Sequence, residues 1–226
     1  MITALVVGAD KGIARSIADQ LHARGDRVVA ACLGSGADRA ADGGEVVPDV
    51  DVTSGEAVAR LAQTLRDRQI ALDWVLHVAG VLGLDTLGEI DYDDVRRQLE
   101  INTIGPLRTV EAVAPLVVDG GKVGIVTSRV GSLGDNTSGG MYAYRVSKAG
   151  ANMVALNLHH DLSVREISVL ALHPGMVATD LTKDYPGDYA YITPEEAAAG
   201  LVKDLDNLTP ENSGRFQHSN GTFLPW

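Results

Sequence analysis

Short, continuously apolar runs alternate along this chain with segments in which apolar residues recur every three or four positions. The runs predict strands buried on both faces, and the spaced segments predict amphipathic helices. The predicted strands cover residues 2–7, 27–33, 45–47, 72–78, 122–127 and 167–172, with a short last strand around Phe216. The predicted helices cover residues 12–24, 54–68, 91–115, 142–162 and a segment that begins at Thr193. Ser54 and Thr193 are the expected N-caps of their helices, and a kink is expected near Gly105-Pro106. Residues 34–44, rich in glycine and alanine, are predicted to form a loop or a frayed turn.

Strands that alternate with helices along the chain are typical of the α/β class, with a doubly wound parallel sheet and helices on both of its faces. The pattern predicts a sheet of about seven strands. We find no internal repeat, low-complexity segment or linker that would divide the chain. We therefore expect residues 1–226 to form a single domain.

Composition narrows the range of partners and compartments. The net charge is −11 with no basic run, so its field repels phosphate backbones and we expect no nucleic-acid partner. No stretch reaches the ~18 apolar residues of a membrane span, and the N-terminal segment lacks the basic region of a signal peptide. The single cysteine, Cys32, suits a reducing compartment, so we expect a cytoplasmic protein.

The loop from Gly8 to Ala14 joins the first predicted strand to the first predicted helix. Its small residues allow the backbone to approach a pyrophosphate, and the start of the helix offers free N–H groups and a positive dipole end. Glycines also serve any tight turn between a strand and a helix, so the pattern is a weak signal by itself. Its place at the first crossover of an α/β chain favours the dinucleotide interpretation.

Tyr144 and Lys148 are four residues apart in a predicted helix and therefore share one of its faces. A lysine there can favour the phenolate and lower the tyrosine pKa from about 10 toward neutrality, where a general acid or base is useful. The same spacing is common on solvated helices, so the pair alone is weak evidence. Ser128 directly follows a predicted strand and could face the same point. Ser132 and Ser138, in the following loop, are alternatives to it.

Six motifs occur in the order and at the spacing of the short-chain dehydrogenase/reductase family, which the chain resembles over essentially its whole length. They are Gly8-x-x-x-Gly12-Ile13, Ala79-Gly80, Asn102, Ser128, Tyr144-x-x-x-Lys148 and Pro174-Gly175. The segment 128–148 is similar to the branch that contains the C-factor signalling protein and the sniffer-type carbonyl reductases. The last residues, 208–226, resemble the C-factor side of that branch. The resemblance implies a Rossmann-type fold and an NAD(P)-dependent oxidoreductase.

The resemblance also implies roles for individual residues. Tyr144 would donate a proton to a carbonyl oxygen or remove one from an alcohol, and Lys148 would lower its pKa and bind the nicotinamide ribose. Ser128 would hold the substrate oxygen, and Asn102 would place a water that links Lys148 to solvent. The implied cofactor contacts are Gly8, Asp10, Lys11, Gly12, Ile13, Asp51, Val52, Ala79, Gly80, Asn102, Tyr144, Lys148, Pro174, Gly175, Val177 and Thr179.

The end of the second strand bears on the choice of nucleotide. An acidic residue at that strand end would bind the 2′-hydroxyl of NAD, and this chain has Cys32-Leu33-Gly34 there instead. Lys11 could pair with a 2′-phosphate, although a solvated turn lysine is the alternative. Leu33 stands where many NADP-using members carry arginine. We therefore expect NADP to be favoured over NAD.

Two departures from the family pattern stand near the proposed site. Ala14 occupies the third glycine position of the loop, and His77-Val-Ala-Gly80 replaces the usual Asn-Asn-Ala-Gly. His77 is interpreted as a buried strand residue rather than a catalytic group. No cluster of histidine, cysteine and carboxylate residues has metal-ligand spacing, so we expect no metal.

The expected substrate is a small carbonyl compound or alcohol in an apolar pocket with an aromatic rim. The segment 181–192 stands where the family carries a substrate lid, and it contains three tyrosines. Surplus apolar positions on the helices at 91–115 and 142–162 predict a homodimer or homotetramer. The leading hypothesis is an NADPH-dependent carbonyl reductase. The alternative is a C-factor-like signalling protein that binds NAD(P) with little or specialised lipid-alcohol turnover.

Overall fold

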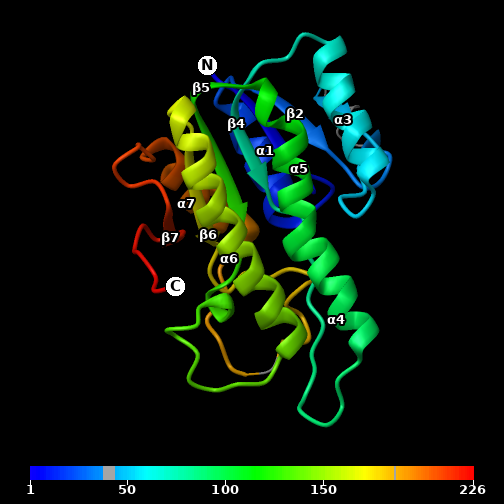
Figure 1. Cartoon of the computed structure of the whole chain (residues 1–226), viewed down its shortest axis with the longest axis vertical. Coiled ribbons are helices and arrows are strands. Elements are labelled where there is room, and N and C mark those ends of the chain that lie inside the picture. Colours follow the sequence, from blue (N-terminus) through cyan, green and yellow to red (C-terminus); the bar gives the residue numbers. More distant parts are fainter. Residues whose placement is uncertain (38–43, 186) are drawn as a thin grey trace.

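A computed structural model describes residues 1–37, 44–185 and 187–226 (Figure 1). Within these residues, seven parallel strands form one sheet in the order β3-β2-β1-β4-β5-β6-β7. The strands are β1 (Thr3–Val7), β2 (Arg27–Ala31), β3 (Glu45–Val47), β4 (Leu72–His77), β5 (Val117–Val126), β6 (Ser168–His173) and β7 (Arg215–His218). The predicted α/β class and doubly wound parallel sheet are confirmed. The loop predicted over 34–44 lies partly outside the described residues.

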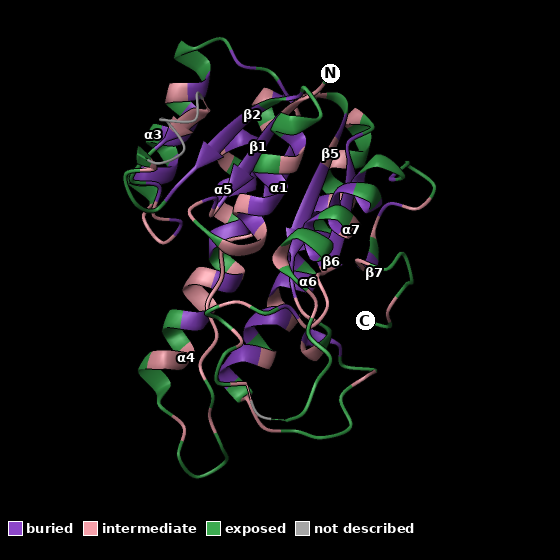
Figure 2. Ribbon diagram, turned by 180° about the vertical axis from the view of Figure 1, so that it is seen from behind, coloured by how far each residue is buried: buried purple, intermediate pink, exposed green. Residues whose placement is uncertain are grey.

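Helices cover both faces of the sheet. They are α1 (Gly12–Ala23), α3 (Gly55–Asp67), α4 (Tyr92–Leu99), α5 (Gly105–Val113), α6 (Tyr142–Leu162) and α7 (Pro194–Asp206). Helices α1 and α7 pack on one face, and α3, α5 and α6 pack on the other (Figures 1 and 2). Helix α4 continues beyond α5 and packs against α6.

The continuous apolar character of the strands follows from this layering. Successive side chains of a strand point to opposite faces of the sheet. Leu5 and Val7 of β1 therefore join the core beneath α3, α5 and α6, and Ala4 and Val6 join the core beneath α1 and α7. Strands β1, β2, β4 and β6 are buried at all but one position each, and the centre of the sheet is largely purple in Figure 2.

Local capping chemistry sets two of the helix starts. The Ser54 hydroxyl accepts a hydrogen bond from the Ala57 amide at 3.2 Å, as its predicted N-cap role requires. At α7, the Thr193 hydroxyl accepts from the Glu196 amide at 3.1 Å, and the Glu196 carboxylate accepts from the Thr193 amide at 2.8 Å. This reciprocal pair is a capping box, and both predicted helix starts are confirmed.

Two predicted elements differ from the structure. The helix predicted over 91–115 is divided by a π-helical turn at Glu100–Ile104, just before the predicted kink at Gly105-Pro106. Because Pro106 has no amide hydrogen, it cannot donate to the carbonyl of Asn102, and the helix is distorted one turn earlier. The fifth strand begins at Val117 instead of residue 122, and its pairing with β4 shifts register between Leu72 and Trp74.

The parallel arrangement brings the loops after the strands to one edge of the sheet. The carboxyl end of β5 points to the lower part of the molecule in Figure 1, where the start of α6 also lies. Strands β1, β4 and β6 run parallel to β5 and end at the same edge. Ligands bind at this edge in open α/β sheets, near the point where the strand order reverses. Among the helices that the structure describes, none is both long enough and apolar enough to cross a membrane.

Candidate active site

The ends of β1 and β4 touch at the centre of this edge. The Val7 carbonyl accepts hydrogen bonds from the amides of Val78 and Ala79, each at 3.1 Å. Gly8 has a φ of +87°, and a Cβ placed on it would lie 2.9 Å from both the Cα and the amide nitrogen of Ala79. Only glycine fits this position, so the loop before α1 is held directly against the loop after β4.

The start of α1 faces the segment that follows β6. Gly12 also has a positive φ, +59°, and a Cβ there would lie 3.7 Å from the Thr179 side chain. Ile13 packs against the core beneath α1. The first amides of α1 are therefore presented to a space bounded by glycine backbone and by Thr179. That arrangement fits a pyrophosphate group.

Asn102 ties three segments together. Its amide nitrogen donates to the Val81 carbonyl and to the Ser147 hydroxyl, and its amide oxygen accepts from the Val81 amide, all at 2.9 Å. The Ser147 hydroxyl donates in turn to the Tyr144 carbonyl at 2.8 Å. Asn102 is buried, so these bonds fix the loop after β4 against the second turn of α6.

Gly80 lies between Asn102 and Lys148. A Cβ on Gly80 would be 3.1 Å from the Asn102 amide oxygen and 3.3 Å from Lys148 Nζ. Lys148 Nζ donates to the Val126 carbonyl at 3.2 Å. The structure thus places Asn102, Gly80 and Lys148 close together.

Tyr144 and Ser128 meet at the same place. Tyr144 is buried, its side chain shares a hydrogen bond with Ser128, and Lys148 Nζ lies 5.7 Å from the centre of its ring. Ser128 directly follows β5 and begins a short turn, so the sheet positions its hydroxyl. The Thr127 hydroxyl donates to the Lys148 carbonyl at 3.0 Å, which holds α6 against that strand end.

The alternatives for these positions are engaged elsewhere. The Ser132 hydroxyl accepts from the Asp135 amide at 3.0 Å, and the Ser138 hydroxyl accepts from Arg145 at 2.9 Å. Tyr142 is partly exposed on another side of α6. The grouping of Ser128, Tyr144 and Lys148 is therefore the one that the fold assembles.

Burial controls the ionisation of this group. Desolvation raises the pKa of Tyr144 above its ordinary value of 10, while the hydrogen bond from Ser128 acts in the opposite direction and nearby Tyr185 adds to the rise. Desolvation also lowers the pKa of Lys148 to about 8. The expectation that Lys148 lowers the Tyr144 pKa is therefore not met in this structure, because loss of hydration outweighs the effect of the neighbours.

The predicted nucleotide-contact residues that follow β1 and β3 have partners within the protein. The Asp10 carboxylate accepts from the amides of Leu33 at 2.8 Å and Gly34 at 2.9 Å. The exposed Lys11 ammonium forms an ion pair with Asp180 at 2.6 Å. The Asp51 carboxylate accepts from the amide and the hydroxyl of Thr53, at 2.9 Å and 2.7 Å. Neighbouring Val52 is buried beside Gly105.

The segment after β6 closes the other side of the site. Gly175 has a φ of +91°, and the Pro174 carbonyl accepts from the Ser219 hydroxyl at 2.9 Å. Val177 is buried and pairs with Ile192 in a short bridge. Thr179, two residues after Val177, lies next to Gly12.

Sequence reasoning missed Asp85 as a structural residue of the site. Its carboxylate accepts hydrogen bonds from the amides of Tyr142, at 2.5 Å, and Ala143, at 2.8 Å, at the start of α6. A carboxylate at a helix N-terminus satisfies free amides and interacts favourably with the dipole. Because Asp85 lies far from α6 in the sequence, no local signal could reveal this cap.

His77 is buried at the end of β4, as interpreted from the sequence. Desolvation and the nearby Lys148 charge lower its pKa to about 3, so the ring is neutral at pH 7. Its Nε2 atom has no hydrogen-bond partner in the protein. Within the described residues, no group of three or more histidine, cysteine or carboxylate side chains is arranged to hold a metal.

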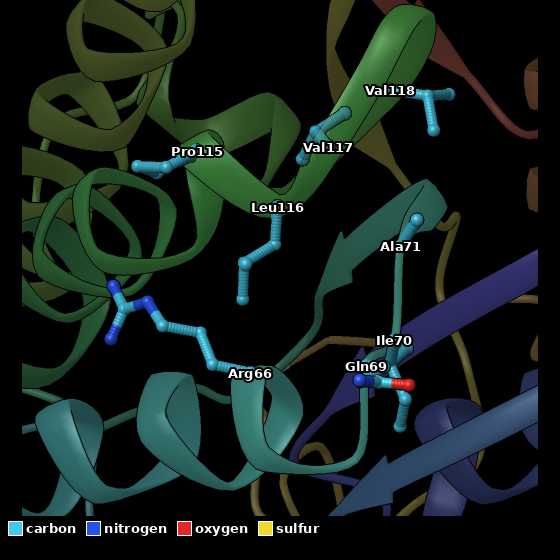
Figure 3. A pocket seen from close by; sticks show the side chains of 8 residues that line it. All are labelled: Arg66, Gln69, Ile70, Ala71, Pro115, Leu116, Val117 and Val118. Atoms are coloured by element: carbon cyan, nitrogen blue, oxygen red, sulfur yellow. The ribbon is translucent and has the colours of Figure 1, made fainter.

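A pocket of about 430 Å³ lies away from these residues (Figure 3). Its walls come from the end of α3, the start of β4 and the segment that leads into β5. The lining residues are Arg66, Gln69, Ile70, Ala71, Pro115, Leu116, Val117 and Val118. They precede β4 and begin β5, so this pocket lies at the opposite edge of the sheet from the Tyr144 site.

Comparison with known proteins places this arrangement in a family. The short chain dehydrogenase profile matches residues 2–190. The chain is 70% identical to 1-hydroxy-2-glutathionyl-2-methyl-3-butene dehydrogenase of Rhodococcus sp. (strain AD45), and the match covers 100% of both chains. It is 42% identical to C-signal of Myxococcus xanthus over 158 residues, which are 69% of this chain and 93% of that protein.

The fold is also that of a solved reductase. The crystal structure of NADPH-bound carbonyl reductase from chicken fatty liver has a TM-score of 0.90 and 26% identity, and covers 100% of this chain and 99% of its own. The chain therefore belongs to the short-chain dehydrogenase/reductase family, a family of nucleotide-dependent oxidoreductases. The predicted resemblance to the branch of C-factor and carbonyl reductases is confirmed.

Burial of Lys148 predicts a pH-dependent stability. Its pKa is about 8 in the folded chain and 10.5 when the side chain is fully hydrated, so the unfolded chain binds more protons between these values. Folding stability should therefore rise from pH 8 to pH 10, by up to about 1.4 kcal/mol per pH unit, relative to a Lys148→Met variant. Above pH 10 the raised pKa of Tyr144 lowers the stability of both proteins as the pH rises, since both contain this tyrosine.

Urea unfolding of both proteins at several pH values measures this difference. Lys203→Met, which removes an exposed lysine of α7, is the matched control and should leave the pH dependence of the wild type unchanged. Parallel curves for wild type and Lys148→Met would show that burial does not shift the lysine pKa.

Proposed function

We propose that this chain is an NAD(P)-dependent oxidoreductase that interconverts an alcohol and a carbonyl compound through Ser128, Tyr144 and Lys148. The observation that carries the proposal is the buried phenol of Tyr144, which shares a hydrogen bond with Ser128 and has a ring centre 5.7 Å from the Lys148 ammonium. These groups stand at the carboxyl edge of the sheet, beside the glycine-lined start of α1. We also propose that Asn102 positions these residues through its hydrogen bonds to Val81 and Ser147.

The residues fit a nicotinamide dinucleotide. Gly8 and Gly80 leave space where any Cβ would meet Ala79 or Lys148, and the amides at the start of α1 suit a pyrophosphate. Lys148 would bind the nicotinamide ribose, and the segment from Pro174 to Thr179 would border the nicotinamide. When bound, the cofactor supplies or accepts the hydride.

Tyr144 transfers the proton, and Ser128 and Lys148 stabilise the negative charge that forms on its oxygen. In carbonyl reduction the hydride adds to carbon, the Tyr144 proton passes to oxygen, and a phenolate remains. Its negative charge is stabilised by the hydrogen bond from Ser128 and by the Lys148 ammonium. In alcohol oxidation the phenolate takes the proton back. A neutral buried phenol is thus the form of Tyr144 that serves reduction, and its anion is the form that serves oxidation.

The substrate is proposed from the relative that is 70% identical over the full chain. Its name describes an alcohol that carries a glutathionyl group on the neighbouring carbon. We propose the same class, a glutathione-conjugated alcohol, oxidised to the carbonyl. Aromatic side chains support a large substrate: Tyr185 is near enough to Tyr144 to raise its pKa, and it packs edge-on against the exposed Tyr189 with ring centres 5.7 Å apart. Reduction of a small carbonyl compound, predicted from the sequence, is the same chemistry in reverse.

A signalling role is the second candidate. The 42% identity to C-signal favours it, although that match covers only 69% of this chain. In this case the chain would bind a nucleotide and turn over little or a specialised lipid alcohol. The complete set of Ser128, Tyr144 and Lys148 favours the enzymatic role.

Two further proposals concern the whole molecule. We propose that residues 1–226 act as one domain, which the single seven-stranded sheet supports. We propose a cytoplasmic location, which the single cysteine of the sequence supports. For the nucleotide, the NADPH of the carbonyl reductase structure supports the expected preference for NADP. The carboxylate of Asp10 at the end of β2 argues against that preference.

We propose a homodimer or homotetramer built on the outer faces of α5 and α6. Leu107 of α5 and Ile104, the last residue of the π-helical turn before it, are exposed, and so are Val146 and Met153 of α6. This turn lies against α6, where the Thr103 hydroxyl donates to the Ser147 carbonyl at 2.7 Å. Exposed apolar side chains that share one surface are typical of subunit interfaces.

Removal of the Tyr144 hydroxyl should abolish turnover and preserve nucleotide binding. We expect Tyr144→Phe to lower kcat by at least about a hundredfold, because the proton donor is lost. Tyr142→Phe removes the same atom from an outward position of the same helix and should keep normal activity. Nucleotide oxidation or reduction is followed by absorbance. Equal rates for the two variants would remove Tyr144 from the reaction.

The substrate class can be tested with paired alcohols. Primary alcohols with and without a glutathionyl group on the neighbouring carbon should differ in kcat/KM by at least about tenfold in favour of the conjugate. The reason is that the remote part of the substrate contributes binding energy in the transition state. A preference for the unconjugated alcohol would contradict the proposed class, and nucleotide binding without turnover of any alcohol or carbonyl would favour the signalling role.

The oligomer should depend on the exposed apolar residues of α6. We expect Val146→Glu combined with Met153→Glu to yield monomers, because buried unpaired carboxylates oppose association. Val164→Glu changes an exposed valine beyond the end of α6 and serves as the control. Light scattering coupled to size-exclusion chromatography gives the mass. A monomeric wild type would contradict the proposal.

A further inference from the structure

The Asp10 carboxylate occupies the end of β2 although Asp10 belongs to the loop after β1. Oδ2 accepts from the Leu33 amide at 2.8 Å, and Oδ1 accepts from the Gly34 amide at 2.9 Å. A Cβ on Gly34 would lie 3.3 Å from Oδ1, so the two segments are in direct contact. Leu33 and Gly34 follow the end of β2, so both bonds hold the carboxylate just beyond that strand, where the chain has no acidic side chain of its own.

This place lies on the path that a dinucleotide would follow. The pyrophosphate is expected at the start of α1, next to Gly12, and the adenine at Asp51-Val52, after β3. In the sheet, β2 stands between β1 and β3. The adenosine ribose joins pyrophosphate to adenine, so it must cross the carboxyl end of β2. The Asp10 carboxylate lies at this position.

A 2′-phosphate would meet an unfavourable environment at this point. The Leu33 and Gly34 amides, which could donate to a phosphate, already donate to Asp10. The carboxylate adds a like charge at short range. Lys11, the neighbouring cation, is paired with Asp180 at 2.6 Å, and Leu33 presents an exposed apolar side chain. A ribose hydroxyl, by contrast, can donate to a carboxylate oxygen that still has free lone pairs.

We infer that Asp10 is the residue that selects the nucleotide, binding the adenosine ribose hydroxyls of NAD and disfavouring the 2′-phosphate of NADP. This inference rests on the nicotinamide cofactor of the proposed function. It reverses the preference that the sequence predicted, because that prediction sought an acid on the second strand itself. The fold instead delivers an acid to the same strand end from the glycine-rich loop.

Equilibrium binding tests the inference independently of turnover. Dissociation constants for NADH and NADPH are measured by nucleotide fluorescence or calorimetry on the full chain. We expect the wild type to bind NADH at least about tenfold more tightly than NADPH. Asp10→Asn keeps the side-chain shape and removes the charge, and should lower that ratio at least about tenfold, mainly through tighter NADPH binding. Asp10→Asn combined with Leu33→Arg should bind NADPH more tightly than NADH.

Asp93→Asn is the matched control, since it removes one carboxylate from the exposed surface of α4 and should leave the ratio unchanged. Circular dichroism and the thermal midpoint establish that each variant is folded. Tighter NADPH than NADH binding by the wild type, or an unchanged ratio in Asp10→Asn, would overturn the inference. Selective NADH binding without turnover of any alcohol or carbonyl would uphold it while contradicting the proposed reaction.

Discussion

The contact between the ends of β1 and β4 is the constraint on which the site depends. The Val7 carbonyl accepts from two successive amides after β4, and Gly8 leaves no space for a Cβ against Ala79. From this point the chain continues toward β2 on one side, while β4 leads toward β5 on the other. The divergence opens the space at the sheet edge, and the same contact sets the position of Gly80 beside Lys148.

A buried polar network links the loop after β4 to α6. Asn102 forms three hydrogen bonds to Val81 and Ser147, and Ser147 bonds to the carbonyl of Tyr144. Buried polar groups contribute to a unique structure when each has its partner, and they destabilise it when one is left unpaired. The π-helical turn that contains Asn102 is therefore part of the site, because it aims the amide at both neighbours. Fold and chemistry are linked through this one side chain.

The features predicted from the sequence are those that depend on local chemistry or on strand topology. Ser54 was identifiable as a cap from its own segment, and Ser128 was placed by the strand before it. The early start of β5, the cap by Asp85 and the position of the Asp10 carboxylate could not be predicted in this way. Each depends on a partner distant in sequence. The pKa of Tyr144 was predicted in the wrong direction because helical spacing conveys proximity to Lys148 but not the extent of burial.

Burial favours the protonated form of Tyr144 and the deprotonated form of Lys148, and this difference suits proton transfer to and from a substrate. Desolvation disfavours the phenolate of Tyr144 and the ammonium of Lys148 when each is considered alone. Once the phenolate forms, however, the two opposite charges lie in a medium where their attraction is stronger than in water. With a pKa of about 8, Lys148 is largely charged at pH 7 and can provide that attraction. Tyr144 therefore keeps its proton when no substrate is bound. The nearby Lys148 charge still limits the free-energy cost of transferring that proton to a substrate oxygen placed beside Ser128.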